Sequence, residues 1–260
     1  VRIIMDSSLE VPIGSENQKV EAMSQSAVML SGVPTSSWTY GCSATAAGMI
    51  FGYYDRNGYA DMYTGPAGGG VVPLTDMGNQ CSIIATRNGF DGLTANGHVD
   101  DYWTGYGNTG PDPWEGNWTE HAWAECTADF MGTSQWKWDF LGRDGNKDFN
   151  KDGATALWTY SGSGGKLYDY TPKASAGMPQ TSLCHGLRLF AESRGYEVIE
   201  NYTQSIDALY EDGFSFADFI AEIDAGYPVM IQLEGHSTVG VGYDEADEII
   251  YIHDKGEFRP

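Results

Sequence analysis

Residues 41–54, Gly-Cys-Ser-Ala-Thr-Ala-Ala-Gly-Met-Ile-Phe-Gly-Tyr-Tyr, are the stretch that decides the fold. The residues after Cys42 are small or apolar and carry no charge before Asp55, so we expect a helix that is buried on every side. Cys42 then lies at the N-terminus of this helix, where unpaired backbone amides and the helix dipole lower the pKa of a thiol. That environment suits a catalytic cysteine, but a packed core cysteine or half of a disulfide explains the stretch equally well.

A histidine and an aspartate near the end of the chain are the partners that a nucleophilic cysteine needs. Residues 229–233 and 236–243 alternate apolar side chains and predict two adjacent strands, and a third predicted strand ends just before Asp254. In an antiparallel meander the start of one strand lies beside the end of the next, so we expect His236 and Asp254 to be neighbours. His236 would take the thiol proton, and Asp254 would hold the imidazole in the correct tautomer.

Three motifs carry a resemblance to a known family. They are residues 38–48, Trp-Thr-Tyr-Gly-Cys-Ser-Ala-Thr-Ala-Ala-Gly, residues 235–243, Gly-His-Ser-Thr-Val-Gly-Val-Gly-Tyr, and the pair at 253–254, His-Asp. Together they resemble the C39-like branch of the papain-like cysteine peptidases. The resemblance implies an α+β papain-like fold, with a helical half carrying the cysteine, an antiparallel sheet half carrying the histidine, and the substrate cleft between them. It also implies that Cys42 is the nucleophile, His236 the general base and Asp254 the orienting residue.

One part of the family pattern is missing. The family usually has a Gln several residues before the nucleophile, which donates to the oxyanion, whereas Thr35, Ser36, Ser37 and Trp38 occupy that region here. We expect the backbone amide of Cys42 as one donor, and a hydroxyl of Ser36 or Ser37, or the indole of Trp38, as the second. The missing Gln supports an alternative, a catalytically weak or inactive papain-like module that acts in binding or adhesion. Acyl transfer to an amine would use the same residues as hydrolysis.

The charge of the chain restricts its partners. With 36 acidic and 14 basic residues the formal net charge is -22, which repels phosphate backbones and anionic lipids, so we expect no nucleic acid partner. A peptide or protein substrate fits better, cationic substrates are favoured, and the thiol chemistry requires no cofactor. No apolar run approaches 18 residues and no basic segment precedes an apolar one at the start, so we expect no membrane span and no signal peptide.

Composition also bears on location and domain organisation. High acidity, many Trp and Tyr residues and loops rich in Asn and Gly are typical of a secreted or cell-surface bacterial protein, and the first residue, Val1, indicates a processed or trimmed chain. We expect residues 1–33 to be an N-terminal arm or the remnant of a pro-segment. Residues 34–260 would form the peptidase domain, with a helical half at about 34–170 and a sheet half at about 171–260. Cys42 and His236 lie farther apart than the roughly 130 to 150 residues usual in papain relatives, which predicts an insertion in the first half.

Two helices are expected in the second half of the chain. Apolar residues repeat with a helical period from Leu183 to a stop at Gly195, and again after Ser215, a predicted N-cap. Between them, residues 196–199 predict a short strand.

An acidic loop and three further cysteines leave structural questions open. The loop alternates oxygen-bearing side chains as the first half of an EF-hand-type calcium loop does, but the bidentate Glu is absent, so both a structural calcium site and a solvated turn remain open. Its candidate ligands are Asp144, Asn146, Asp148, Asn150 and Asp152. If Cys42 is the nucleophile, at most one disulfide forms among Cys81, Cys126 and Cys184, and the sequence does not select the pair.

Overall fold

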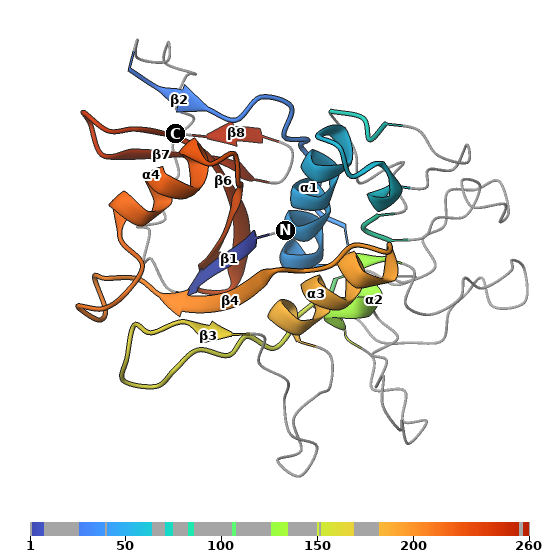
Figure 1. Ribbon diagram of the computed structural model, residues 1–260. Helices are drawn as coiled ribbons and strands as arrows, with labels where there is room; N and C mark the ends of the chain where they lie inside the picture. The colour runs from blue at the N-terminus through green and yellow to red at the C-terminus, as the bar shows by residue number, and fades with distance from the viewer. Residues whose placement is uncertain are drawn as a thin grey trace, which may run out of the picture.

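A curved β-sheet lies beside a buried helix in this computed structural model (Figure 1). The structure describes residues 2–7, 26–39, 41–63, 71–74, 83–85, 106–107, 126–134, 150, 152–168, 182–254 and 257–259. The strands in this part of the chain are β1 (Arg2–Ser7), β2 (Val28–Met29), β3 (Leu167–Tyr168), β4 (Glu200–Ser205), β5 (Val229–Leu233), β6 (His236–Asp244), β7 (Ile249–Asp254) and β8 (Glu257–Arg259).

The sheet has the strand order β3-β4-β1-β5-β6-β7-β8, and β2 pairs with β6 beyond the first residue of β5, Val229. β5, β6 and β7 form the predicted antiparallel meander, and β5 and β6 are joined at Gly235, whose φ of 68° suits the turn. The expected α+β class is confirmed. The sheet is not wholly antiparallel, however, because β1 lies between β4 and β5 and runs parallel to both.

The buried helix is α1 (Cys42–Arg56), which begins at the predicted residue. Ser43 to Asp55 are all buried in it, as expected for a helix with apolar or small residues on every side. Its small residues allow close packing: a Cβ added at Gly48 would lie 2.3 Å from Cγ1 of Ile84. The hydroxyl of Thr127 donates to the carbonyl of Ala44 at 3.0 Å, which fixes the first turn of α1 against its neighbour.

The remaining helices cover the sheet and support α1. They are η1 (Ala60–Met62), α2 (Thr127–Met131), α3 (Leu183–Ser193) and α4 (Phe216–Asp224). The expected Ser215 cap is confirmed, since its side chain and Asp218 form a capping box. The strand expected at residues 196–199 is wrong, because these residues form no strand and β4 begins at Glu200, four residues after the expected start. In the described part of the chain, no helix has the length and apolar character of a membrane span.

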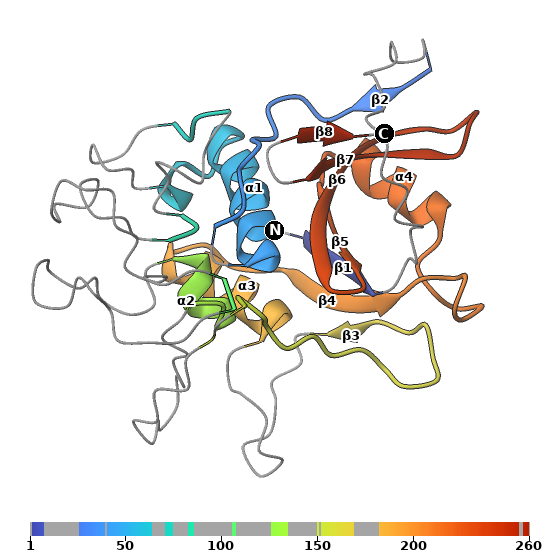
Figure 2. The ribbon, with the colours of Figure 1, turned by 180° about the vertical axis from the view of Figure 1, so that it is seen from behind.

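Two apolar clusters position the sheet between helices. One joins α1, α2 and α3 to β5, β6 and β7, and the other joins α4 to β4, β5 and β6. Figure 2 shows the sheet strands between α1 and α4. Gly240 of β6 lies on the α4 side, where an added Cβ would lie 2.5 Å from the ring of Phe219. The N-terminus of α1 meets the sheet near the turn between β5 and β6, where Oγ of Ser43 in α1 lies 2.7 Å from Oγ of Ser237 in β6.

Candidate active site

Cys42 is the first residue of α1, and the chain enters the helix through Gly41. Gly41 has a φ of 102°, which favours glycine. A side chain there would also have no room, because an added Cβ would lie 2.2 Å from the carbonyl oxygen of Gly153. The carbonyl of Gly41 accepts from the backbone N–H of Thr45 at 3.1 Å and from its hydroxyl at 2.9 Å. The backbone around Cys42 is thus held in place by close packing and hydrogen bonds.

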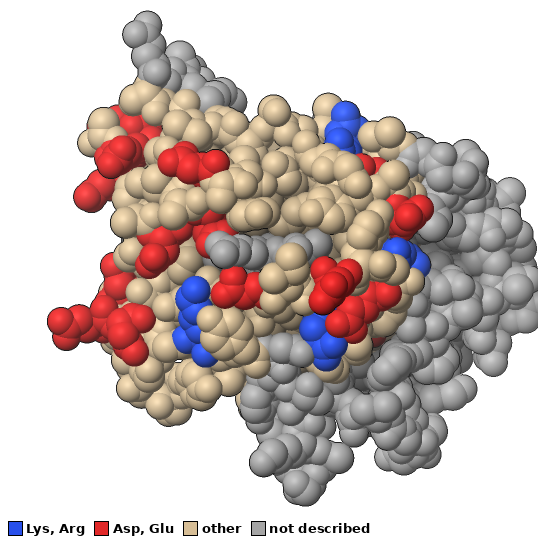
Figure 3. All heavy atoms as spheres, viewed as in Figure 1, with Lys and Arg blue, Asp and Glu red and all other residues tan. Residues whose placement is uncertain are grey.

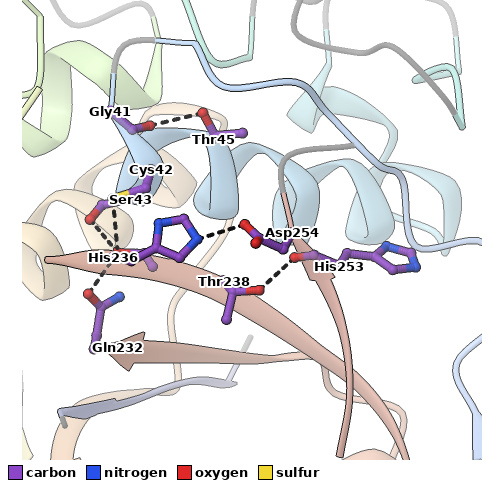
Figure 4. A network of polar contacts seen from close by, with 10 residues as sticks. Gly41, Cys42, Ser43, Thr45, Gln232, His236, Thr238, His253 and Asp254 are labelled. Carbon is purple, nitrogen blue, oxygen red and sulfur yellow. Dashed lines mark hydrogen bonds and ion pairs between the residues drawn. The ribbon is translucent and has the colours of Figure 1, made fainter. Parts of the chain in front are cut away.

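His236 and Asp254 come together at one end of the meander. His236 is the first residue of β6 and Asp254 the last of β7. Nε2 of His236 lies 2.6 Å from Oδ1 of Asp254, and both side chains are mostly buried. Figure 4 shows the imidazole between Cys42 and Asp254. Since Nε2 faces the carboxylate of Asp254, Nδ1 is the ring nitrogen that can exchange a proton with the sulfur of Cys42.

The electrostatics of the three side chains favour an ion pair. The hydrogen bond with Asp254 is the largest cause that raises the pKa of His236 from 6.5 to about 9, and the contact with Cys42 adds to it. Burial raises the pKa of the Cys42 thiol, but hydrogen bonds with His236 and Ser237 and the charge of His236 outweigh burial and lower it below its ordinary value. The site therefore stabilises the imidazolium form of His236 and shifts the equilibrium of Cys42 towards the thiolate.

Three polar residues next to Cys42 were missed in the sequence. Oγ of Ser237 lies 3.7 Å from the sulfur of Cys42 and 2.7 Å from Oγ of Ser43. Ser237 also donates to Oε1 of Gln232 at 2.7 Å. A signal was present, because Ser43 directly follows the predicted nucleophile and Ser237 the predicted base. Gln232 is paired with Ser237 across β5 and β6, but only the register of these strands brings the two together.

A cavity of about 680 Å³ opens beside Cys42 and His236. Its apolar part is lined by four leucines from separate segments, Leu157, Leu183, Leu209 and Leu233. Asp152 and Glu234 are exposed and also line it. The cavity thus combines an apolar surface with acidic groups next to the thiol.

The structure describes all three predicted side-chain oxyanion donors. None of Ser36, Ser37 and Trp38 is among the described residues that line it. The hydroxyl of Ser36 is fully buried and donates to the carbonyl of Ser37 at 3.0 Å. The ring of Trp38 packs edge-on against Tyr106, with 6.0 Å between centroids. Their role as oxyanion donors stays a prediction.

Three of the five predicted calcium ligands, Asp144, Asn146 and Asp148, lie outside the residues that the structure describes. Asn150 is buried, and its Oδ1 accepts from the backbone N–H of Ala154 at 3.1 Å while its Nδ2 donates to Gly132. The exposed Asp152 accepts from the same N–H at 3.2 Å. Within the part of the chain that the structure describes, no group of three or more His, Cys, Asp or Glu residues could hold a metal ion.

Cys42 forms no disulfide with the other cysteines that the structure describes. Cys126 and Cys184 are buried, and the sulfur of Cys184 lies 3.3 Å from Oδ1 of Asn201. Cys81 lies outside the described residues. The pairing of the other three cysteines therefore stays a prediction, while Cys42 has the thiol that a nucleophile requires.

Comparison with known proteins gives one match. The family model described as Peptidase_C39 like family matches residues 127–257, about half of the chain. No curated protein and no solved structure matches. The matched range includes His236 and Asp254, and Cys42 lies N-terminal to it.

Proposed function

The chain belongs to the Peptidase_C39 like family, as its motifs predict, and we propose that it is a cysteine peptidase with Cys42 as nucleophile. His236 acts as general base and acid, and Asp254 orients its imidazole. The observation that carries the proposal is the hydrogen-bonded pair of His236 and Asp254 at 2.6 Å, next to a thiol of lowered pKa at the mouth of a cavity.

The reaction follows from these positions. The thiolate of Cys42 attacks the carbonyl carbon of a peptide bond, and the carbonyl oxygen becomes an oxyanion near the N-terminus of α1, where the backbone N–H of Cys42 is one donor. The imidazolium of His236 then protonates the leaving amine, and an acyl-enzyme remains. Neutral His236 next takes a proton from water, which attacks the thioester and releases the acid. If an amine attacks instead of water, the same residues perform acyl transfer.

The walls of the cavity indicate the substrate. Leu209 is 51% exposed and lines the cavity together with the three more buried leucines, so an apolar side chain of the substrate would bury surface there. Asp152 and Glu234 favour a cationic group nearby. Acidic side chains are also spread over the face shown in Figure 3, where Lys and Arg are few. We therefore propose a peptide substrate with adjacent apolar and basic residues.

We also propose a secreted or cell-surface bacterial location, on the basis of the acidic composition.

The alternative function is a binding module without turnover. The observation that favours it is the absence of Ser36, Ser37 and Trp38 from the described lining of the cavity, which leaves one oxyanion donor assigned.

Peptide hydrolysis separates the two functions. The wild-type chain is incubated with a mixture of peptides that carry Leu next to Lys or Arg, and products are identified by mass spectrometry. We expect cleavage that falls at least 10³-fold in Cys42→Ala and in His236→Ala. Asp247→Ala, in the exposed turn between β6 and β7, is the control and retains activity. Peptide binding by wild type and Cys42→Ala alike, with no cleavage by either, would support the binding module.

A further inference from the structure

Ser43, Ser237 and Gln232 form a buried chain of hydrogen bonds under Cys42. Their exposed fractions are 5%, 4% and 7%. Figure 4 shows Cys42 and Ser43 on the helix side of this chain and Gln232 on the strand side. Oγ of Ser237 is its centre, because it lies within contact of the Cys42 sulfur, the Ser43 hydroxyl and the Gln232 amide.

The number of protons at Ser237 limits what this centre can do. A serine hydroxyl has one proton to donate and two lone pairs that accept. In the arrangement observed, Ser237 donates to Oε1 of Gln232, so Ser43 and the thiol of Cys42 must both donate to Ser237. This arrangement suits a neutral thiol. A thiolate has no proton to give, and it would face a hydroxyl oxygen whose own proton points away.

The amide of Gln232 offers a second arrangement. Its Nε2 is buried and has no hydrogen-bond partner among the described residues, although buried donors are normally paired. Rotation of the amide by half a turn exchanges its oxygen and nitrogen, which differ little in shape. Nε2 then donates to Ser237, and the hydroxyl of Ser237 is released to donate to the sulfur. This second arrangement suits a thiolate.

We propose that Gln232 is a positioning residue whose amide turns with the ionisation of Cys42, so that Ser237 accepts from the thiol and donates to the thiolate. The proposal rests on the proposed function in that Cys42 is the nucleophile. No covalent bond changes in this step, and the proton that leaves the thiol is taken by His236.

Other charged groups also act on the sulfur, so the experiment must separate them from Gln232. His236 contacts Cys42 directly, and Asp254 acts through His236. The other titratable side chains in the described lining of the cavity are Tyr106, Asp152 and Glu234. None of these changes in a variant of Ser237 or Gln232, so such variants isolate the hydrogen-bond chain.

The rate of Cys42 alkylation by iodoacetamide, measured from pH 4 to 10, gives the pKa of the thiol. We expect Ser237→Ala to raise it by about one unit, a tenfold lower rate below the pKa, since the thiolate loses a donor. Gln232→Met leaves the hydroxyl free to donate, as the turned amide does in wild type, so we expect the pKa of Cys42 to stay at the wild-type value. An amide that never turns would keep the Ser237 proton from the thiolate, and its removal would lower the pKa. A change of one unit in either direction in Gln232→Met would overturn the proposal.

A second measurement follows the amide itself. In ¹⁵N–¹H spectra, the side-chain NH₂ signal of Gln232 is identified as the one missing in Gln232→Met. We expect this signal to shift with the pKa of Cys42 in wild type and not to shift at that pKa in Ser237→Ala, in which His236 and Cys42 still titrate. A signal that is constant while Cys42 ionises contradicts the switch. The absence of peptide hydrolysis, with the coupled titration intact, would instead contradict the proposed function alone.

Discussion

The pair of His236 and Asp254 makes a quantitative prediction about Asp254→Asn. In wild type the pKa of His236 is raised from 6.5 to about 9, with the hydrogen bond to Asp254 as the largest cause. A rise of this size corresponds to about 3 kcal/mol of preference for the charged ring, and solvent next to the partly exposed pair reduces it to about 1–2 kcal/mol. The native state therefore holds its proton through a range in which the unfolded chain loses it.

The sign follows from this difference in bound protons. The stabilisation is fully present below pH 6.5, the ordinary pKa of the ring, and is lost as the pH rises through about 9. We expect the free energy of unfolding of wild type to fall by about 1–2 kcal/mol more across this range than that of Asp254→Asn. Asn keeps the size of the side chain and removes its charge, so packing is preserved.

Two assays test this prediction. Urea unfolding at several pH values between 6 and 9.5 gives the slope of stability, and NMR of the imidazole gives the pKa of His236 in both proteins. In the variant we expect this pKa to be lower by at least one unit. Because a less basic imidazole stabilises the thiolate less, we expect the pKa of Cys42 to rise and its alkylation at pH 6.5 to be slower, roughly tenfold for each unit of that rise. An unchanged pKa of His236 would refute the reasoning.

Further predictions concern packing, the cavity, the helix cap and calcium. Gly41→Ala should lower the free energy of unfolding by about 2–4 kcal/mol, through the clash with Gly153, whereas Gly58→Ala, with φ 104° and open space around it, should cost only about 1 kcal/mol in urea unfolding. Leu209→Ser should lower kcat/KM about tenfold for peptides with a large apolar side chain and leave Tm unchanged; an equal loss for all peptides would contradict this. Ser215→Ala should cost about 1 kcal/mol in urea unfolding by loss of the capping box, with alkylation of Cys42 unaffected. If the loop at residues 144–152 binds calcium, 1 mM CaCl₂ should raise the Tm of wild type but not of Asp148→Ala; equal Tm values would reject the site.

The sequence predicted the parts of the fold that depend on local patterns. α1 begins at Cys42 because a run of small and apolar residues follows a glycine. The position of His236 beside Asp254 follows from the alternation of apolar residues and from the geometry of a meander. Their catalytic roles stay a prediction, because geometry alone does not measure turnover.

The sequence did not predict features that depend on distant pairing. β1 consists of only six residues, and nothing in them indicates that β4 and β5 lie on its two sides. Gln232 is the one polar residue of β5, and its place in the sequence does not show which residue it faces. Its contact with Ser237 could be predicted only from the register of β5 and β6. The oxyanion donors were sought among the residues before Cys42 along the chain. The buried hydroxyl of Ser36 donates to the carbonyl of Ser37, and the roles of Ser36, Ser37 and Trp38 as oxyanion donors stay predictions.

The central claim is that Cys42 is a nucleophile activated by His236. The most direct measurement is the rate of iodoacetamide labelling of Cys42 as a function of pH, mapped by mass spectrometry, in wild type and His236→Ala. We predict that wild-type Cys42 is labelled with an apparent pKa well below the free-thiol value of about 8.5, and that the pKa returns to about 8.5 or above in the variant. Equal pKa values in the two proteins, or a Cys42 that is not labelled, would contradict the account.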